Sequence, residues 1–170
     1  VWNMTYAPTD GGFMAPVSQK ELWDRLKYFL DYMLPIAEEN GVELALHPDD
    51  PPMPELRQTA RLVYRPELYQ KLIDMNPNKA NKLELCLGSL QEMESDKPIY
   101  DYLDSYLKQE RVSYIHFRNV KGKVPCYDEV FVDEGGDLLL AHAGGARADR
   151  ELLGDGGGQE LVLGLLEDHR

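Results

Sequence analysis

Apolar residues recur along most of the chain with two spacings, one typical of helices and one typical of strands. The helical spacing first covers residues 22–34, after a capping box formed by Ser18 and Glu21. In such a box the serine hydroxyl and the glutamate carboxylate each accept a hydrogen bond from a backbone N–H that the helix leaves unpaired. Asn40-Gly41 is a typical helix C-terminus, so we expect this helix to end there.

Short apolar runs predict strands between the helices. The predicted strands are Val42–His47, Lys82–Leu87 and Val112–Phe117, with a further one at Trp2–Tyr6. Pro66 and Pro98 each stand at the first position of a further predicted helix, where a proline costs no helical hydrogen bond. Strands that alternate with helices pair in parallel and are joined by right-handed crossovers. The sequence therefore predicts an α/β fold.

The last 36 residues differ from the rest of the chain. Nine of the fourteen glycines lie at or after Gly135, no aromatic residue follows Phe131, and no lysine follows Lys123. We therefore divide the chain into a folded domain of residues 1–134 and an irregular, Gly-rich C-terminal tail of residues 135–170. Loss of Lys and aromatics with enrichment of Gly, Ala and Arg is also the composition that a shifted, GC-rich reading frame would produce.

Charge and composition exclude several classes of protein. The chain has 18 Lys and Arg residues against 30 Asp and Glu residues, a formal charge of -12 that leaves no electrostatic footprint for nucleic acid or an anionic membrane. Its apolar runs are far shorter than the roughly 20 residues of a membrane-spanning helix. The first residues carry no sign of a secretory signal, so we expect a cytoplasmic protein in which Cys86 and Cys126 are free thiols.

Three predicted strands end in a residue that can bind a metal ion, namely His47, Cys86 and His116. In parallel α/β folds functional groups gather at the carboxyl ends of the strands, so these side chains would surround one point. Imidazole and thiolate suit first-row divalent metals, and bonds of about 2.0–2.3 Å would put the donor atoms roughly 3–4.5 Å apart. Each residue alone is also typical of a structural role, the histidines as hydrogen-bonded residues and the cysteine as a small buried side chain.

Polar residues directly follow two of these strand ends. The loop after the first strand is stiffened by prolines and carries Asp49 and Asp50. We interpret this loop either as an ordinary Pro/Asp turn or as a source of contacts to a metal ligand or a substrate hydroxyl. Arg118 and Asn119 follow the third strand, and we assign both to substrate binding because arginine is the natural bidentate partner of a carboxylate. A salt bridge from Arg118 to the acidic surface is the alternative.

Four stretches of the chain resemble the mannonate dehydratase family. They are residues 22–40, His47-Pro48-Asp49-Asp50-Pro51-Pro52, Leu85-Cys86-Leu87-Gly88-Ser89 and Ile115-His116-Phe117-Arg118-Asn119-Val120, and the similarity extends over roughly residues 15–135. The first of the three short elements is fairly specific, and its combination with the other two is strong. The resemblance implies a xylose-isomerase-like (β/α)8 TIM barrel. A complete barrel needs about 250 residues, so we expect a partial barrel of three to four βα units.

The resemblance also implies an activity and a site. Members of the family remove water from D-mannonate to give 2-dehydro-3-deoxy-D-gluconate in the breakdown of glucuronate, with Mn²⁺ or Fe²⁺ as the cofactor. His47, Cys86 and His116 match the family's metal ligands. The fourth ligand is an aspartate in a Pro-Asp-His motif on a later strand, and the histidine of that motif is a candidate acid/base. The only later Asp-His pair in this chain is Asp168-His169, which lacks the proline.

Assembly and rival functions complete the expectations. A partial barrel has two open sheet edges, so we expect a homo-oligomer or an aggregate. The expected partner is a small sugar acid, with no nucleic acid and no membrane. Two alternatives stay open. One is another metal-dependent sugar isomerase or epimerase of the same superfamily, whose sites favour carboxylates and histidines over cysteine. The other is a truncated fragment without catalysis.

Overall fold

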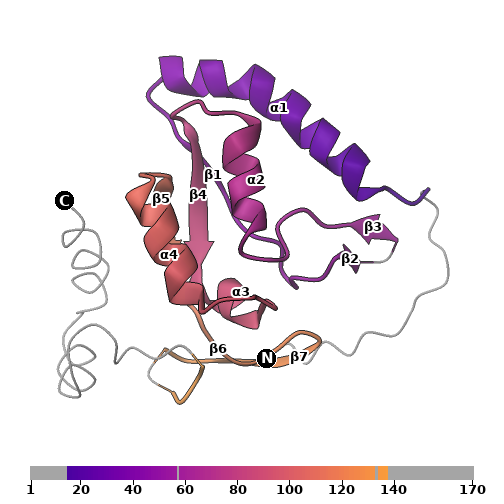
Figure 1. Ribbon diagram of the computed structural model, residues 1–170, viewed down its shortest axis with the longest axis vertical. Helices are drawn as coiled ribbons and strands as arrows, with labels where there is room; N and C mark the ends of the chain where they lie inside the picture. The colour runs from indigo at the N-terminus through magenta and orange to yellow at the C-terminus, as the bar shows by residue number, and fades with distance from the viewer. Residues whose placement is uncertain (1–14, 57, 133, 138–170) are drawn as a thin grey trace.

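The computed structural model describes residues 15–56, 58–132 and 134–137 (Figure 1). The predicted strand at Trp2–Tyr6, the tail from residue 138 onward and the Asp168-His169 pair lie outside the described residues. Within the described residues the chain forms four helices, a three-stranded sheet and two separate two-stranded hairpins.

The helices and strands follow the predicted order, with three additions. The helices are α1 (Gln19–Glu39), α2 (Leu68–Met75), α3 (Leu87–Glu92) and α4 (Ile99–Lys108). The strands are β1 (Leu44–Leu46), β2 (Glu55–Leu56), β3 (Thr59–Ala60), β4 (Asn81–Cys86), β5 (Val112–His116), β6 (Asn119–Lys123) and β7 (Cys126–Val130). The predicted helices are confirmed by α1, α2 and α4, and the predicted strands by β1, β4 and β5. The additions are α3 and the hairpins β2–β3 and β6–β7.

The sheet is parallel, as the alternation of helices and strands predicted. β4 lies in the middle and pairs in parallel with β1 on one side and with β5 on the other. Figure 1 shows β4 at the centre of the molecule, with α3 just beyond its carboxyl end. Among the described strands β1 and β5 are the outer ones, so this part of the chain has two open sheet edges.

The ends of α1 are set by local hydrogen bonds. The Ser18 hydroxyl accepts from the backbone N–H of Glu21 at 3.2 Å, which confirms one half of the capping box. The carboxylate of Glu21 instead contacts Arg25 one turn further on, at 2.5 Å. At the other end Asn40 is the C-cap, and Gly41 follows with φ +65°, a left-handed conformation that a glycine adopts without strain.

The hydrophobic core lies between one face of the sheet and the helices. Leu83 and Leu85 of β4 are completely buried in it. Burying a leucine side chain contributes about 1.5–3 kcal/mol, so these two positions anchor the central strand. The helices supply most of the other large core side chains, among them Trp23, Leu30, Leu34, Tyr69, Leu72, Tyr102 and Tyr106.

The opposite face of the sheet is polar, because side chains alternate along a strand. The Tyr114 hydroxyl donates to Glu84 at 2.7 Å, and the Ser113 hydroxyl donates to Glu43 at 2.7 Å. The β4–β5 register shifts between Leu83 and Glu84, which leaves Ser113 as an extra residue in β5. Through this bulge both Ser113 and Tyr114 reach the polar face.

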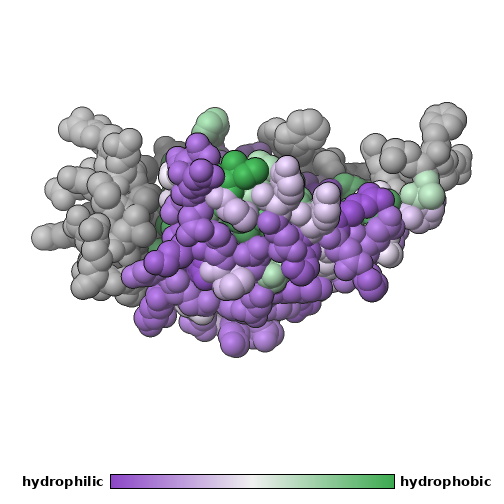
Figure 2. Space-filling model, turned by 90° about the horizontal axis from the view of Figure 1, so that it is seen from above, coloured by the Kyte–Doolittle hydropathy of each residue, from purple (hydrophilic) through white to green (hydrophobic). Residues whose placement is uncertain are grey.

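The surface over α1 is mostly hydrophilic, with scattered apolar side chains (Figure 2). The large exposed apolar residues of α1 are Tyr28, Phe29, Tyr32 and Ile36. None of the helices in the described ranges is both long enough and apolar enough to cross a membrane.

The additions to the predicted fold are short elements. The strand predicted at residues 82–87 ends one residue early, at Cys86, and α3 begins at once. Two-residue strands and a six-residue helix are too short to show a period in the sequence. The β6–β7 hairpin depends on Gly122, where a Cβ atom would lie 2.8 Å from the carbonyl oxygen of Cys126.

Candidate metal centre

The carboxyl ends of β1, β4 and β5 bring His47, Cys86 and His116 together. His47 follows the last residue of β1, while Cys86 and His116 end their strands and are paired across the sheet. One donor atom from each residue lies within 4.8 Å of the other two. This limit slightly exceeds the roughly 3–4.5 Å expected for donors that share an ion, so small side-chain rotations would bring them into coordination.

The His47 imidazole has one nitrogen engaged by the backbone. Its Nδ1 lies 2.6 Å from the carbonyl oxygen of Pro48. A carbonyl oxygen only accepts, so Nδ1 is the donor in this contact, and the tautomer that it favours leaves the lone pair on Nε2. A hydrogen bond from one ring nitrogen to a backbone carbonyl is typical of histidines that bind a metal through the other ring nitrogen.

The Cys86 sulfur is buried beside a hydroxyl donor. Cys86 and Ser89 are both completely buried, and the Ser89 hydroxyl donates to the sulfur at 3.2 Å. Both thiols in the described residues are free, as predicted, with Cys86 buried and Cys126 exposed. A buried cysteine sulfur with two neighbouring imidazoles is a donor set that suits a first-row divalent metal.

A carboxylate that the sequence analysis did not single out lies next to both histidines. Glu84 Oε1 is 3.9 Å from His47 Nε2 and 4.0 Å from His116 Nδ1. The residue stands two positions before Cys86, so alternation along β4 places both on the same face. That spacing is the sequence signal that could have identified it.

A cavity of about 590 Å³ opens beside the two imidazoles. Its polar lining consists of His47, His116, Asp50, Arg118, Tyr127 and Glu129. Two of the three candidate metal ligands and two of the four predicted substrate contacts therefore face the same space.

Arg118 lies among three carboxylates. Its Nη1 is 2.6 Å from Asp50, its Nη2 is 2.7 Å from Glu92, and its Nε is 3.1 Å from Glu129. Arg118 thus forms salt bridges with acidic side chains, one of them buried, and its assignment to substrate binding stays a prediction. Every guanidinium nitrogen has an acidic partner, so a bidentate bond to a substrate carboxylate would first require one of these contacts to break.

Three carboxylates surround the single positive charge of Arg118. Of the three, Glu92 is the one whose side chain is completely buried. Burial and the neighbouring Asp50 charge raise the pKa of Glu92 to about 8, and Arg118 only partly offsets them. Neither oxygen has a well-aligned hydrogen bond within the described residues, although Oε1 is close to Arg118. No sequence pattern pointed to this residue.

Gly88 is required because the Arg118 side chain passes directly over it. A Cβ atom on Gly88 would lie 2.7 Å from Cγ of Arg118. Ser89, the next residue, accepts from Arg118 Nη1 at 3.2 Å. Arg118, which follows the third strand, thus packs against Gly88 and donates to Ser89 of the Cys-x-Gly-Ser element. It also forms an ion pair with Asp50 of the proline-rich loop.

Both oxygens of Asp49 contact the protein itself, and its assignment to substrate binding stays a prediction. Its Oδ2 accepts from the backbone N–H groups of Leu62 and Val63, each at 2.7 Å. Its Oδ1 forms an ion pair with Arg61 at 2.7 Å. Both oxygens are engaged with the segment after β3, so Asp49 holds the loop while Asp50 faces the cavity.

The side chain of Asn119 is also engaged by the protein, and its assignment to substrate binding stays a prediction. It is buried in β6, where its Oδ1 accepts from the backbone N–H of Val120 at 3.0 Å and its Nδ2 donates to the Glu134 carbonyl at 3.3 Å. A Cβ atom on Gly136 would collide with this side chain. Asn119 is therefore directed toward residues 134–136, and it does not line the cavity.

A parallel α/β sheet whose carboxyl edge gathers two imidazoles, a thiol and a cavity is typical of α/β enzymes, whose functional groups lie at the carboxyl ends of the strands. Comparison with known proteins makes this specific. Residues 13–138 match the D-mannonate dehydratase (UxuA) family, and the chain belongs to that family.

Similar proteins bear the same name. The chain is 40% identical over 105 residues to a mannonate dehydratase of Geobacillus thermodenitrificans, covering 62% of this chain and 28% of the relative. It is 27% identical over 143 residues to one of Streptococcus suis, covering 81% and 38%. The crystal structure of mannonate dehydratase from Streptococcus suis serotype 2 aligns with a TM-score of 0.65 at 30% identity, over 72% of this chain and 35% of that one. The chain thus spans about a third of the length of these relatives.

Proposed function

We propose that the chain is the part of a mannonate dehydratase that carries most of its metal site. The reaction removes water from D-mannonate and yields 2-dehydro-3-deoxy-D-gluconate, a step in glucuronate breakdown. The observation that carries the proposal is the meeting of His47, Cys86 and His116 at three adjacent strand ends, with donor atoms within 4.8 Å. Membership of the D-mannonate dehydratase family supports the same substrate.

The donor set fits Mn²⁺ or Fe²⁺. His47 would bind through Nε2, because its Nδ1 donates to Pro48. Cys86 would bind as a thiolate whose charge the Ser89 hydroxyl stabilises. When bound, the cation would stabilise the negative charge that develops on the substrate carboxylate as the neighbouring proton leaves.

Asp50 is the residue that we assign to the substrate hydroxyls. It lines the cavity, and Arg118 Nη1 at 2.6 Å and the Tyr127 hydroxyl at 3.1 Å hold its two oxygens. Arg118 acts here by orienting Asp50 within the three-carboxylate cluster. A substrate carboxylate could still reach the guanidinium by displacing the exposed Glu129.

The remaining chemistry belongs to parts of the fold outside the described strands. We propose that β1, β4 and β5 are three strands of a (β/α)8 barrel, and that the fourth metal ligand and the acid/base lie on later strands. The length of the relatives, about three times that of this chain, supports this. We also propose the division into residues 1–134 and 135–170, since the family match ends at residue 138. Sequencing the coding region across this junction tests whether the frame is continuous.

The cellular setting follows from the same proposal. A sugar-acid catabolic enzyme works in the cytoplasm, where buried thiolates stay reduced. The two open sheet edges favour association with further copies of the chain.

An assay with D-mannonate tests the proposed function. The purified 170-residue chain is loaded with Mn²⁺ or Fe²⁺ and incubated with D-mannonate, and formation of the 2-keto-3-deoxy acid is followed chromatographically. Product that requires both the metal and Cys86, with Cys86→Ala as the control, supports the proposal. Conversion of a keto-sugar panel without any dehydration of D-mannonate would favour an isomerase. Metal binding that requires Cys86, without turnover of either substrate, would support the metal site and show that catalysis needs the later strands. Absence of metal binding would contradict the proposal.

A further inference from the structure

Glu84 is a partly buried carboxylate next to two candidate ligands, and the mechanism above does not use it. We propose that Glu84 is a positioning residue of the metal centre, which orients the His116 imidazole and balances the charge of a divalent ion held at the three strand ends. This inference rests on the proposed function only in assuming that a metal binds at the three strand ends.

The geometry places Glu84 directly beneath the histidines. Its Oε1 lies at nearly equal distances from His47 Nε2 and His116 Nδ1, 3.9 and 4.0 Å. Only 13% of the Glu84 side chain is exposed, against 39% for His47 and 48% for His116. These distances exceed those of hydrogen bonds, so Glu84 acts on the site through its charge. A small rotation would also let it accept a hydrogen bond from Nδ1 of His116.

Glu84 is itself held in place from the neighbouring strand. The Tyr114 hydroxyl donates to the same Oε1 atom at 2.7 Å. Tyr114 is paired with Glu84 across the sheet, immediately after the bulge at Ser113. Because β4 and β5 also carry Cys86 and His116 two residues further on, the Tyr114–Glu84 pair has a fixed position relative to both ligands.

The charges of the site favour this role. Two neutral imidazoles and one thiolate bring a single negative charge to a divalent cation. Glu84 supplies the second negative charge in a half-buried position where water screens it little. If His116 binds the ion through Nε2, its Nδ1 faces Glu84, and a carboxylate behind a coordinating imidazole fixes the orientation of the ring and raises its basicity. Loss of such a group typically weakens metal affinity by about 10–100-fold.

Metal affinity of the full 170-residue chain tests the proposal. Mn²⁺ is titrated into wild type, Glu84→Gln and Tyr114→Phe, and free Mn²⁺ is measured by electron paramagnetic resonance. We expect Glu84→Gln to bind one Mn²⁺ per chain about 10–100-fold more weakly, and Tyr114→Phe to show a smaller loss of the same kind. With Co²⁺ as probe, the thiolate-to-metal charge-transfer band should persist while the ligand-field bands shift.

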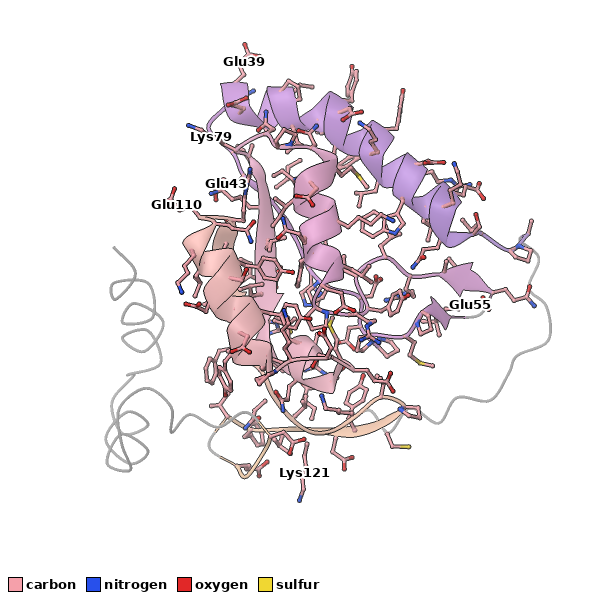
Figure 3. All side chains as sticks on the ribbon, viewed as in Figure 1. Glu39, Glu43, Glu55, Lys79, Glu110 and Lys121 are labelled. Atoms are coloured by element: carbon pink, nitrogen blue, oxygen red, sulfur yellow. The ribbon has the colours of Figure 1, made fainter. Side chains whose placement is uncertain are left out.

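Glu43→Gln is the matched control. Glu43 has the same side chain on the same face of the sheet and also accepts from a hydroxyl, that of Ser113, at 2.7 Å. It precedes β1, whereas His47 follows it, so it lies at the amino end of the sheet away from the site (Figure 3). Its substitution should leave the Mn²⁺ affinity unchanged. Thermal melts of all variants check folding, and if Glu84→Gln does not fold, Tyr114→Phe carries the test.

Three results would overturn the inference. One is an affinity of the folded Glu84→Gln chain, or of Tyr114→Phe where the former does not fold, that stays within about twofold of wild type. Another is a loss as complete as that of Cys86→Ala, which would make Glu84 a ligand instead of a positioning residue. Absence of Mn²⁺ binding by the wild-type chain would overturn this inference and the proposed function together. Either of the first two results leaves the proposed function standing.

Discussion

Replacement of Glu92 by glutamine should remove a strong pH dependence from the stability of the chain. Glu92 is completely buried beside Arg118, which already contacts Asp50 and Glu129. Desolvation, together with the negative charge of Asp50, raises the pKa of Glu92 from 4.5 to about 8. The folded chain therefore keeps the proton on Glu92 over a pH range in which the unfolded chain has lost it.

The size of the effect follows from this shift. At pH 4 both states hold the proton and Glu92 costs nothing. As the pH rises from about 4.5 to 8 the unfolded state is favoured by about 1.4 kcal/mol per pH unit, and above 8 the penalty levels off on the order of 4–5 kcal/mol. Glutamine keeps the shape of the side chain and has no proton to lose, so Glu92→Gln should be increasingly more stable than wild type toward pH 8.

Urea unfolding followed by tryptophan fluorescence measures this difference at pH 5.5, 6.5 and 7.5. The free energy of unfolding of Glu92→Gln minus that of wild type should rise by about 1.4 kcal/mol per pH unit. Glu129→Gln is the control, because Glu129 touches the same guanidinium from an exposed position where water screens its charge. Parallel pH profiles for wild type and Glu92→Gln would refute the reasoning, since they would mean that Glu92 is ionised in the folded state.

Further substitutions test individual contacts. Gly88→Ala should cost about 1–3 kcal/mol in a thermal melt, because the new Cβ meets Arg118 at 2.7 Å, whereas Gly135→Ala, with open space around it, should change nothing. Asp49→Ala leaves two backbone N–H groups without their acceptor and should cost about 2–3 kcal/mol in urea unfolding; an unchanged midpoint would contradict its structural role. Ser89→Ala should weaken Mn²⁺ binding, measured by titration, because the nearby sulfur loses its donor.

The regular elements and the three strand ends could be predicted from the sequence because both follow from local patterns. The spacing of apolar residues predicts α1, and the alternation of helices and strands predicts parallel pairing. Parallel pairing in turn places His47, Cys86 and His116 at one edge without any knowledge of tertiary contacts. The order of helices and strands along the chain is therefore enough to predict that these three residues lie close together.

The roles of the surrounding polar residues depend on contacts that the order of residues does not reveal. Asp49 and Asp50 are adjacent and identical, yet one binds two backbone N–H groups of the segment after β3 and the other faces the cavity. Arg118 belongs to a residue type that often binds substrate carboxylates. Only the fold shows that its guanidinium is already paired with acidic side chains of the protein. Glu92 reads as an ordinary polar helix residue until its burial is known.

Anomalous diffraction from crystals grown with Mn²⁺ is the most direct test of the central claim that three strand ends share one cation. Data collected above and below the manganese absorption edge locate the ion independently of any assumption about its ligands. We predict one peak per chain, within about 2.0–2.5 Å of a nitrogen of His47, a nitrogen of His116 and the sulfur of Cys86. A map without a peak there, or with the ion bound elsewhere on the acidic surface, would contradict the account.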